Sequence, residues 1–189
     1  MKQNFGIQLV QNSTFDLEGL DPLIDEDRRL LDRVKANFLE LMEQPPCLEN
    51  TVKLVIVSPL LDLVGFYQKP FRIETETSVA IEMEDEGIII RGRIDVLVLK
   101  KRLWLLVIES ERSDFAVSKA IPQALAYMLS NLETDKPTFG MITNGNEFLF
   151  LKVFRQEYSN SRLFSLINPS NKLYPVLQML KRLGIEAIA

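Results

Sequence analysis

Two apolar segments near the middle of the chain, 88–99 and 103–111, dominate its hydrophobic pattern. Both are rich in Val, Ile and Leu at odd and even positions, which predicts strands covered on both faces of a sheet. The basic triplet 100–102 between them predicts a turn. With this loop of three residues, Leu99 faces Leu103 across an antiparallel pair. The pattern therefore predicts these two strands at the centre of the sheet.

The apolar residues on either side of this pair recur at helical spacing in four segments. They predict helices over 27–44; over 49–64, with a kink at Pro59 and a stop at Gly65; from Ser118 as N-cap; and from Leu173, with Ser170 or Asn171 as cap and Gly184 as stop. The helix from Ser118 buries Ile121, Ala124, Leu125 and Met128. Its residues Lys119, Gln123 and Tyr127 recur every four positions and form a polar face beside that stripe.

Alternation and turn residues predict the remaining strands. Segment 71–83 alternates between apolar and polar residues and leads into a polar turn at 84–87, and Asn144-Gly145 predicts a hairpin turn between strands 138–143 and 148–154. Residues 1–26 show no period and predict an arm or a short strand with little function. The expected fold class is α/β with a mixed sheet, in the order helix, helix, three-strand antiparallel meander, helix, strand pair, helix.

Length and composition narrow the class of protein. A chain of 189 residues with 47% hydrophobic and 25% charged residues fits a single compact globular domain. It contains no run of eighteen apolar residues, so we expect a cytoplasmic protein without a membrane segment. One cysteine and no histidine exclude an internal disulfide, imidazole bases and histidine zinc sites. A bound metal would be held by oxygen atoms, which favours Mg²⁺ or Mn²⁺.

Three carboxylates interrupt the two apolar strands: Asp95 in the first, and Glu109 and Glu111 in the second. The expected pairing makes Asp95 the diagonal neighbour of Glu109, at roughly 7 to 8 Å between backbones. Glu111 shares the face of Glu109 because alternate strand residues point the same way. Two interpretations follow, a shared divalent ion or a pair of strand-end salt bridges. Glu49, in the first turn of the helix over 49–64, is either a functional acid or compensates the helix dipole.

Several separate segments resemble the PD-(D/E)XK nuclease superfamily and, more narrowly, the nuclease domain at the N-terminus of type I restriction enzyme R subunits and its small stand-alone relatives. ENTVKLVIVSPLLDLVGFY is similar to that family's opening helix with its early Glu, GRIDVLVL to its Gly-x-x-Asp strand and VIESER to its Glu-x-Lys strand. QALAY is similar to the Gln-x-x-x-Tyr helix, and MITNGNEF to the Thr-Asn-Gly hairpin. The resemblance implies a restriction-endonuclease-like domain over 49–189, preceded by an N-terminal extension over 1–48.

Roles follow from the resemblance for the residues that match. Asp95 and Glu109 would bind the divalent ion, and Glu49 would be the outer acid that orients the attacking water. Gln123 and Tyr127 would brace the site beside a DNA substrate.

Basic residues around the acids are the candidates for phosphate contacts in an acidic chain of net charge -4. They are Lys119 and Arg112, together with Arg91, Arg93 and the triplet 100–102. Arg91 and Arg93 share the strand parity of Asp95 and either reach a phosphate or neutralise neighbouring acids; neutralisation is favoured slightly.

Position 111 departs from the family pattern, which has lysine there. Glu111 reverses the charge, and three explanations stay open. Glu111 is a further metal ligand beside Asp95 and Glu109 in an active enzyme; Lys119, one turn before Gln123, supplies the missing cation; or the site is impaired.

The leading expectation is a Mg²⁺-dependent or Mn²⁺-dependent deoxyribonuclease that hydrolyses phosphodiester bonds, with a homodimer and partner proteins of a restriction system as further expectations. The alternative is a nuclease fold kept as a binding or assembly module without turnover. A regulatory module that binds a metal or nucleotide through Asp95 and Glu109 is a third possibility.

Overall fold

A computed structural model represents the whole chain, and the residues whose structure is described are 7–10, 19–43, 46–83, 88–100, 103–130 and 136–188. For 80–83, 88–91, 103–105 and 187–188 only the backbone is described. The expected turn at 84–87 and the loop residues Lys101 and Arg102 lie outside these ranges, as does the side chain of Arg91.

One mixed sheet forms the middle of the molecule, with the strand order β1-β7-β6-β5-β4-β3-β2 and with β8 paired to β6. Its strands are β1 Gln8–Leu9, β2 Phe71–Met83, β3 Ile88–Lys100, β4 Leu103–Ser110, β5 Thr138–Thr143, β6 Glu147–Phe154, β7 Glu157–Asn160 and β8 Phe164–Ser165. Only β4–β5 and β1–β7 pair in parallel among the described pairings. The meander β2-β3-β4 and the hairpin β5-β6 confirm the prediction, whereas β7 and β8 were not predicted.

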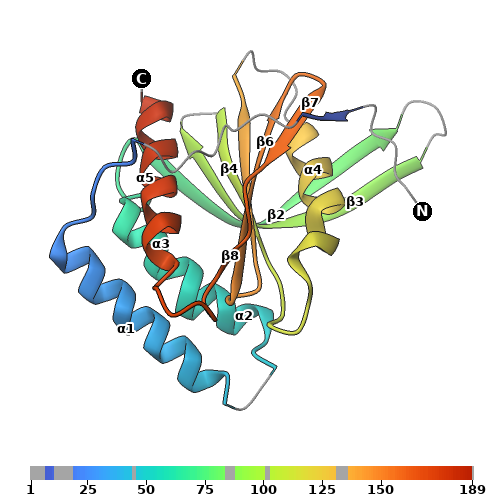
Figure 1. Cartoon of the computed structure of the whole chain (residues 1–189). Helices are drawn as coiled ribbons and strands as arrows, with labels where there is room; N and C mark the ends of the chain where they lie inside the picture. Colours follow the sequence, from blue (N-terminus) through green and yellow to red (C-terminus); the bar gives the residue numbers. More distant parts are fainter. Residues whose placement is uncertain are drawn as a thin grey trace.

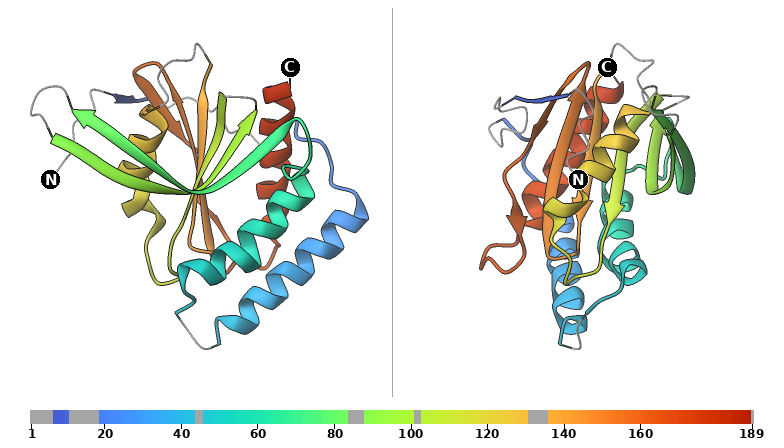
Figure 2. Two further views of the ribbon diagram at one scale, coloured as in Figure 1. Left: turned by 180° about the vertical axis from the view of Figure 1, so that it is seen from behind. Right: turned by 90° about the vertical axis from the view of Figure 1, so that its right-hand side faces the viewer.

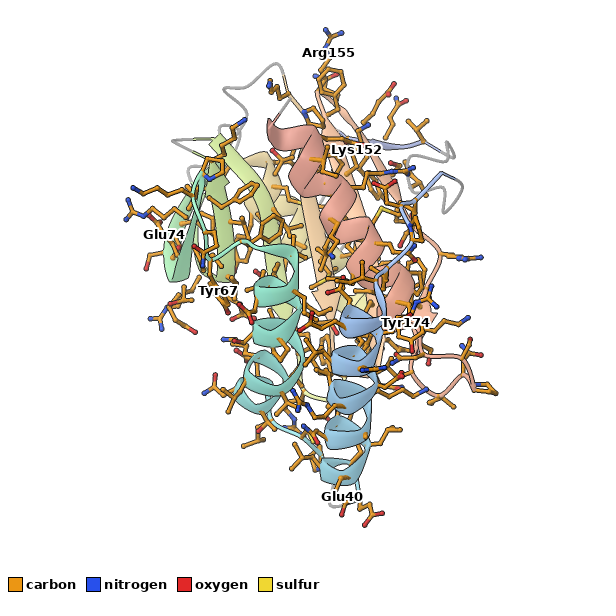
Figure 3. The ribbon with its side chains drawn as sticks, turned by 90° about the vertical axis from the view of Figure 1, so that its left-hand side faces the viewer. Glu40, Tyr67, Glu74, Lys152, Arg155 and Tyr174 are labelled. Carbon is orange, nitrogen blue, oxygen red and sulfur yellow. The ribbon has the colours of Figure 1, made fainter. Side chains whose placement is uncertain are left out.

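Helices cover both faces of the sheet (Figure 1; Figure 2, right). One face carries α1 Asp25–Leu41, the continuous helix formed by α2 Glu49–Val52, the π-helical turn η1 Lys53–Val57 and α3 Ser58–Val64, and the C-terminal α5 Leu173–Ile188. The other face carries the 3₁₀ turn η2 Val117–Ala120 and α4 Ile121–Leu129. Figure 3 looks onto the first layer, where α1, the α2–α3 helix and α5 lie side by side. The α4 crossover connects the parallel strands β4 and β5, as such a connection requires.

Each face buries its own apolar core. Leu31 and Phe38 of α1 pack in the first core with Ile56 and Leu60, so the N-terminal helix shares a core with the helix that follows it. The second core lies under α4 and contains the expected stripe residues Ala124, Leu125 and Met128. Among the described residues, no helix has both the length and the apolar character needed to cross a membrane.

Strands β2 and β3 change faces in their middles. Ile73 packs in the first core but Val79, which has the same parity, packs against α4. Glu76 lies between them with a φ of 54°, in the left-handed region that few residues other than glycine adopt. Both strands turn at this point (Figure 2, left). The expected placement of all apolar residues of 71–83 on one face is therefore wrong, because one left-handed residue redirects the strand.

The pairing of β3 with β4 also differs from the prediction. Lys100 pairs with Leu103, so the connecting loop has two residues rather than three, and the register shifts between Val98 and Leu99. Beyond this irregularity Val96 pairs with Ile108. Asp95 and Glu109 are the next residues of the two strands, just beyond the last described pair.

Two predicted helix signals, at Ser118 and at Gly184, need correction. Ser118 lies inside the 3₁₀ turn η2 and does not cap α4, which begins at Ile121. The irregularity expected at Pro59 takes the form of the π-helical turn that precedes it, and Gly65, with a φ of 85°, ends the helix as predicted. α5 does not stop at Gly184 but continues to Ile188. The glycine allows close packing against Phe66, because a Cβ atom at this position would lie 3.1 Å from that ring. Asn171 caps α5, accepting the Leu173 N–H at 3.0 Å.

Candidate functional site

Four charged side chains meet where β2 and β3 change faces, beside the first turns of the α2–α3 helix. The Lys53 ammonium nitrogen lies 2.8 Å from Asp95 Oδ1, 2.7 Å from Glu49 Oε1 and 3.0 Å from Glu76 Oε1. Glu49 is one turn before Lys53, and this order of acid and base is the favourable one on a helix. Lys53 is thus surrounded by three carboxylates.

The charge of Lys53 is held firmly by its partners. Burial by itself would lower the pKa of this ammonium, but its hydrogen bonds to Asp95, Glu49 and Glu76 raise the pKa above its usual value. In the opposite direction, hydrogen bonds from Lys53 and Arg93 lower the pKa of the Glu76 carboxyl. Both shifts favour the charged forms of Lys53 and Glu76.

The second oxygen of Asp95 is bound by the neighbouring strand. Asp95 Oδ2 accepts the backbone N–H of Ser110 at 2.7 Å and its hydroxyl at 2.9 Å. These bonds link β3 to the end of β4 and orient the carboxylate between Ser110 and Lys53. Asp95 is consequently well solvated by protein groups although it stands in an apolar strand.

Glu109 has a contrasting environment. It is 2% exposed, and its Oε2 accepts a hydrogen bond from the Gln123 amide at 2.9 Å. Its Oε1 is buried without a hydrogen-bond partner among the described residues. Burial, followed by the charge of Asp95, raises the pKa of the Glu109 carboxyl to about 8, and the Gln123 bond offsets only part of this rise.

Glu111 follows the end of β4 and is half-buried. Its N–H donates to the Thr143 carbonyl at 2.8 Å, so the last residue of β5 fixes its position. Burial raises the pKa of the Glu111 carboxyl, and the charges of Glu49 and Asp95 add to the rise. Glu111 therefore belongs electrostatically to the same group of acids.

The Thr-Asn-Gly hairpin supports this region from the other side. Asn144 Oδ1 accepts the N–H groups of Asn146 and Glu147, while its Nδ2 donates to the Phe115 carbonyl at 2.9 Å. Gly145 has a φ of 85°, and a Cβ atom there would overlap the ring of Phe38. The hairpin therefore ties the segment after Glu111 to both the sheet and α1.

Tyr127 links α4 to the Gly-x-x-Asp strand. Its hydroxyl oxygen accepts the Arg93 N–H at 3.2 Å, and its ring covers Gly92, where a Cβ atom would overlap it. Burial, together with the charge of Glu109, raises the pKa of the Tyr127 hydroxyl. The glycine and the tyrosine therefore depend on each other, and both stand beside the acids.

The expected basic residues take other positions. The Lys119 ammonium lies 5.8 Å from the centre of the Phe115 ring, and the Arg112 guanidinium lies 2.8 Å from Asp114. Within the described part of the chain, neither forms an ion pair with the acids of the site. Arg93 lies 3.1 Å from Glu76, which agrees with a neutralising role.

The fit to a divalent ion can be judged from the oxygen atoms. Within the described ranges, no three acidic side chains converge closely enough to hold a metal ion as they stand. Yet Glu109 Oε1 is buried without a partner, close to the charge of Asp95. Carboxylate oxygens of this kind are what Mg²⁺ and Mn²⁺ prefer. The donor atoms fit a hard cation, provided that Asp95, Glu109 and Glu111 move together on binding.

Sequence reasoning missed Lys53 and Glu76. The spacing of Glu49 and Lys53 by four residues placed both on one helix face, but such pairs are common on exposed helices. From the sequence, Glu76 is expected to be a solvent-exposed residue of an alternating strand.

A cavity of about 330 Å³ lies beside this group of charges. Lys53 and Asp95 form part of its wall, with Leu54 and Tyr67 from the helix side and Thr75 from β2. Figure 3 shows Tyr67 where the α2–α3 helix leads towards β2. A ligand in this cavity would reach the pair formed by Lys53 and Asp95.

Comparisons with known proteins agree with the resemblance in the sequence. No curated protein matches the chain significantly. A solved fragment described as belonging to the HsdR subunit of a type I restriction enzyme from Vibrio vulnificus YJ016 aligns with a TM-score of 0.46 and 19% identity over 72% of this chain and 26% of that chain. The family model for the type I restriction enzyme R protein N terminus matches residues 1–159. The chain therefore belongs to the family of type I restriction enzyme R protein N-terminal domains.

Proposed function

We propose that this chain is a divalent-metal-dependent DNA endonuclease domain with a restriction-endonuclease-like core. The observation that carries the proposal is the buried oxygen of Glu109 beside Asp95, which has no hydrogen-bond partner in the described part of the chain. An uncompensated acid in an apolar core costs stability unless it binds something. The family is named for a subunit of a restriction enzyme, and phosphodiester hydrolysis is the chemistry that we propose for such a site.

In this proposal each residue of the site has its own role. Asp95 and Glu109 hold the ion, and Glu111 is a third ligand that the family's lysine would not provide. Gln123 orients Glu109 through its 2.9 Å hydrogen bond. Glu49, which is 46% exposed at the edge of the site, positions the attacking water.

The reaction joins the water oxygen to phosphorus and breaks the bond to the 3′ oxygen, which leaves with a proton as a hydroxyl. A divalent ion, when bound, neutralises the phosphate charge and lowers the pKa of water. The chain itself supplies the orientation of the acids, which rests on Ser110 for Asp95 and on Thr143 for Glu111.

The proposed substrate is DNA, approached by Arg112, Lys119 and the basic residues around the β3–β4 turn. A homodimer would place two sites on opposite strands, since one site per chain cuts one strand. Partner proteins of a restriction system would supply target recognition, in keeping with the family of type I restriction enzyme R protein N-terminal domains.

The test is cleavage of a supercoiled plasmid in Mg²⁺ or Mn²⁺ by the natural chain and by Asp95→Ala. We expect nicking by the natural chain and background nicking by Asp95→Ala. Asp25→Ala is the matched control, because it removes an exposed acid from the first turn of α1. Equal nicking by the natural chain and Asp95→Ala would overturn the proposal.

A second candidate is a nuclease fold that binds DNA or partner proteins without turnover. It is favoured by the ion pair of Lys53 with Asp95, which occupies one expected ligand. DNA binding by gel shift, unchanged by chelation and without cleavage in either metal, would support this candidate over the first.

A further inference from the structure

Position 111 leaves the site without the cation that the family pattern provides. Among the described residues, the ammonium of Lys53 is the cation that contacts the acids of β3, at 2.8 Å from Asp95. Lys119 lies against Phe115 and Arg112 is paired with Asp114, so neither expected candidate reaches Asp95 in this structure.

Lys53 is also placed to meet a ligand. Its side chain is 17% exposed and forms part of the wall of the cavity beside Asp95. It begins the π-helical turn η1, and such wide turns occur often at functional sites. An ammonium on a flexible stem can exchange one oxygen partner for another without movement of the helix.

We propose that Lys53 is the catalytic cation of this site and takes the part that lysine at position 111 has in the family pattern. In the state described here its charge neutralises Asp95 and Glu49. With DNA bound, the ammonium contacts the phosphate that is cleaved. This inference rests on the proposed nuclease function.

The location of Lys53 also makes it a competitor of the metal. A divalent ion held by Asp95 would stand near an ammonium that already binds that carboxylate, and like charges at such a distance repel. Loss of the ammonium should therefore weaken cleavage but strengthen metal binding. A residue that only braced the fold would not change these two quantities in opposite directions.

The experiment compares Lys53→Met with the natural chain in two assays, plasmid cleavage and Mn²⁺ binding by electron paramagnetic resonance. We expect cleavage to fall by about 100-fold, the usual cost of losing one group that stabilises transition-state charge. We expect Mn²⁺ to bind about tenfold more tightly. Lys35→Met is the control, because Lys35 lies on the surface of α1 and donates a hydrogen bond to the Asn168 carbonyl. This substitution should change neither cleavage nor Mn²⁺ binding.

Glu111→Lys provides a rescue. In the Lys53→Met background it exchanges the third ligand for the cation of the family pattern, leaves Asp95 and Glu109 to hold the ion, and should recover about tenfold of the lost cleavage. In the natural chain it should lower cleavage, because it removes a ligand while Lys53 already supplies the cation.

The outcomes separate this inference from the proposed function. Cleavage by Lys53→Met equal to that of the natural chain, with Asp95→Ala inactive, overturns the role of Lys53 and leaves the nuclease intact. A joint loss of cleavage, Mn²⁺ binding and Tm in Lys53→Met shows a structural brace and also overturns it. A natural chain no more active than Asp95→Ala overturns the nuclease function, and the role of Lys53 falls with it.

Discussion

Asp95 and Glu109 lie on the neighbouring strands β3 and β4, yet their surroundings are opposite. Asp95 has an ammonium on one oxygen and two donors of Ser110 on the other. Glu109 has one amide on one oxygen and nothing described on the other. The charge of the first acid is compensated by the fold, and the charge of the second is not. Folding alone therefore accounts for Asp95, whereas Glu109 requires a ligand or a proton.

The largest expected effect is a difference of sign between two amide substitutions in EDTA at pH 9. Asp95→Asn puts an amide beside the Lys53 ammonium and should lower the free energy of unfolding by about 1.5 to 3 kcal/mol, the range for hydrogen bonds to charged groups. Glu109→Gln removes a buried charge with little change of shape and should raise it by about 1 kcal/mol. Urea denaturation measures both. Two changes of the same sign would remove the contrast between the acids.

Gln123→Leu should raise the pKa of the Glu109 carboxyl further and so weaken metal binding. The Gln123 amide is the described hydrogen-bond partner of Glu109, and without it the carboxylate form is less stable. Because a metal ligand must be deprotonated, Mn²⁺ affinity at pH 7 should fall about tenfold. Isothermal titration calorimetry provides the value, and Gln178→Leu, on the surface of α5, is the control. An unchanged affinity would mean that Gln123 does not hold Glu109 in solution.

The raised pKa of Glu109 should make the free energy of unfolding depend on pH. Its pKa is about 8 in the folded chain and 4.5 in its ordinary state, so the folded state keeps a proton that the unfolded state releases between these values. The free energy of unfolding therefore falls as pH rises from about 4.5 to about 8, and changes no further above that range. The difference between the natural chain and Glu109→Gln isolates this contribution. A difference that is independent of pH from 5 to 9 would contradict a raised pKa.

The smallest expected effect concerns the outer member of the ion network. Glu76 is 48% exposed, and its bonds to Lys53 and Arg93 are screened by water. Glu76→Gln should change the free energy of unfolding by less than about 1 kcal/mol. Urea denaturation of Glu76→Gln and Asp95→Asn in parallel tests whether Lys53 stabilises the fold through its ion pair with Asp95 rather than through the one with exposed Glu76.

The elements that sequence predicted well are those with a strong local signal. The helix over 49–64, the strand over 71–83 and the Asn144-Gly145 turn depend on neighbours in the chain, and the structure confirms all three, although the apolar residues of 71–83 do not share one face. The boundaries that failed depend on contacts from elsewhere. In the sequence Gly184 looks like a helix stop, but in the structure it lies against the ring of Phe66, which is far away in the sequence.

The candidate site shows the same division. Spacing led to Asp95, Glu109 and Glu111, because carboxylates in apolar strands are conspicuous, and the family resemblance added Gln123. The register of β3 against β4 depends on an irregularity near Leu99 that no residue type announces. Lys53 was hidden for a similar reason: only the bend at Glu76 brings β2 and β3 to its ammonium.

The bend at Glu76 also divides the β2–β3 hairpin into two parts of unequal local stability. β4 pairs with β3 from Val96 to Lys100, whereas the described residues before Asp95 pair with β2 alone. A two-stranded ribbon is marginal in water, and this one is held against α4 by the contact of Tyr127 with Gly92 and by Ile94 and Val79 in the second core. Its backbone amides should therefore exchange with solvent faster than those of 96–100. The site lies at this boundary, so local opening of the ribbon would expose Asp95 while the first core stays folded.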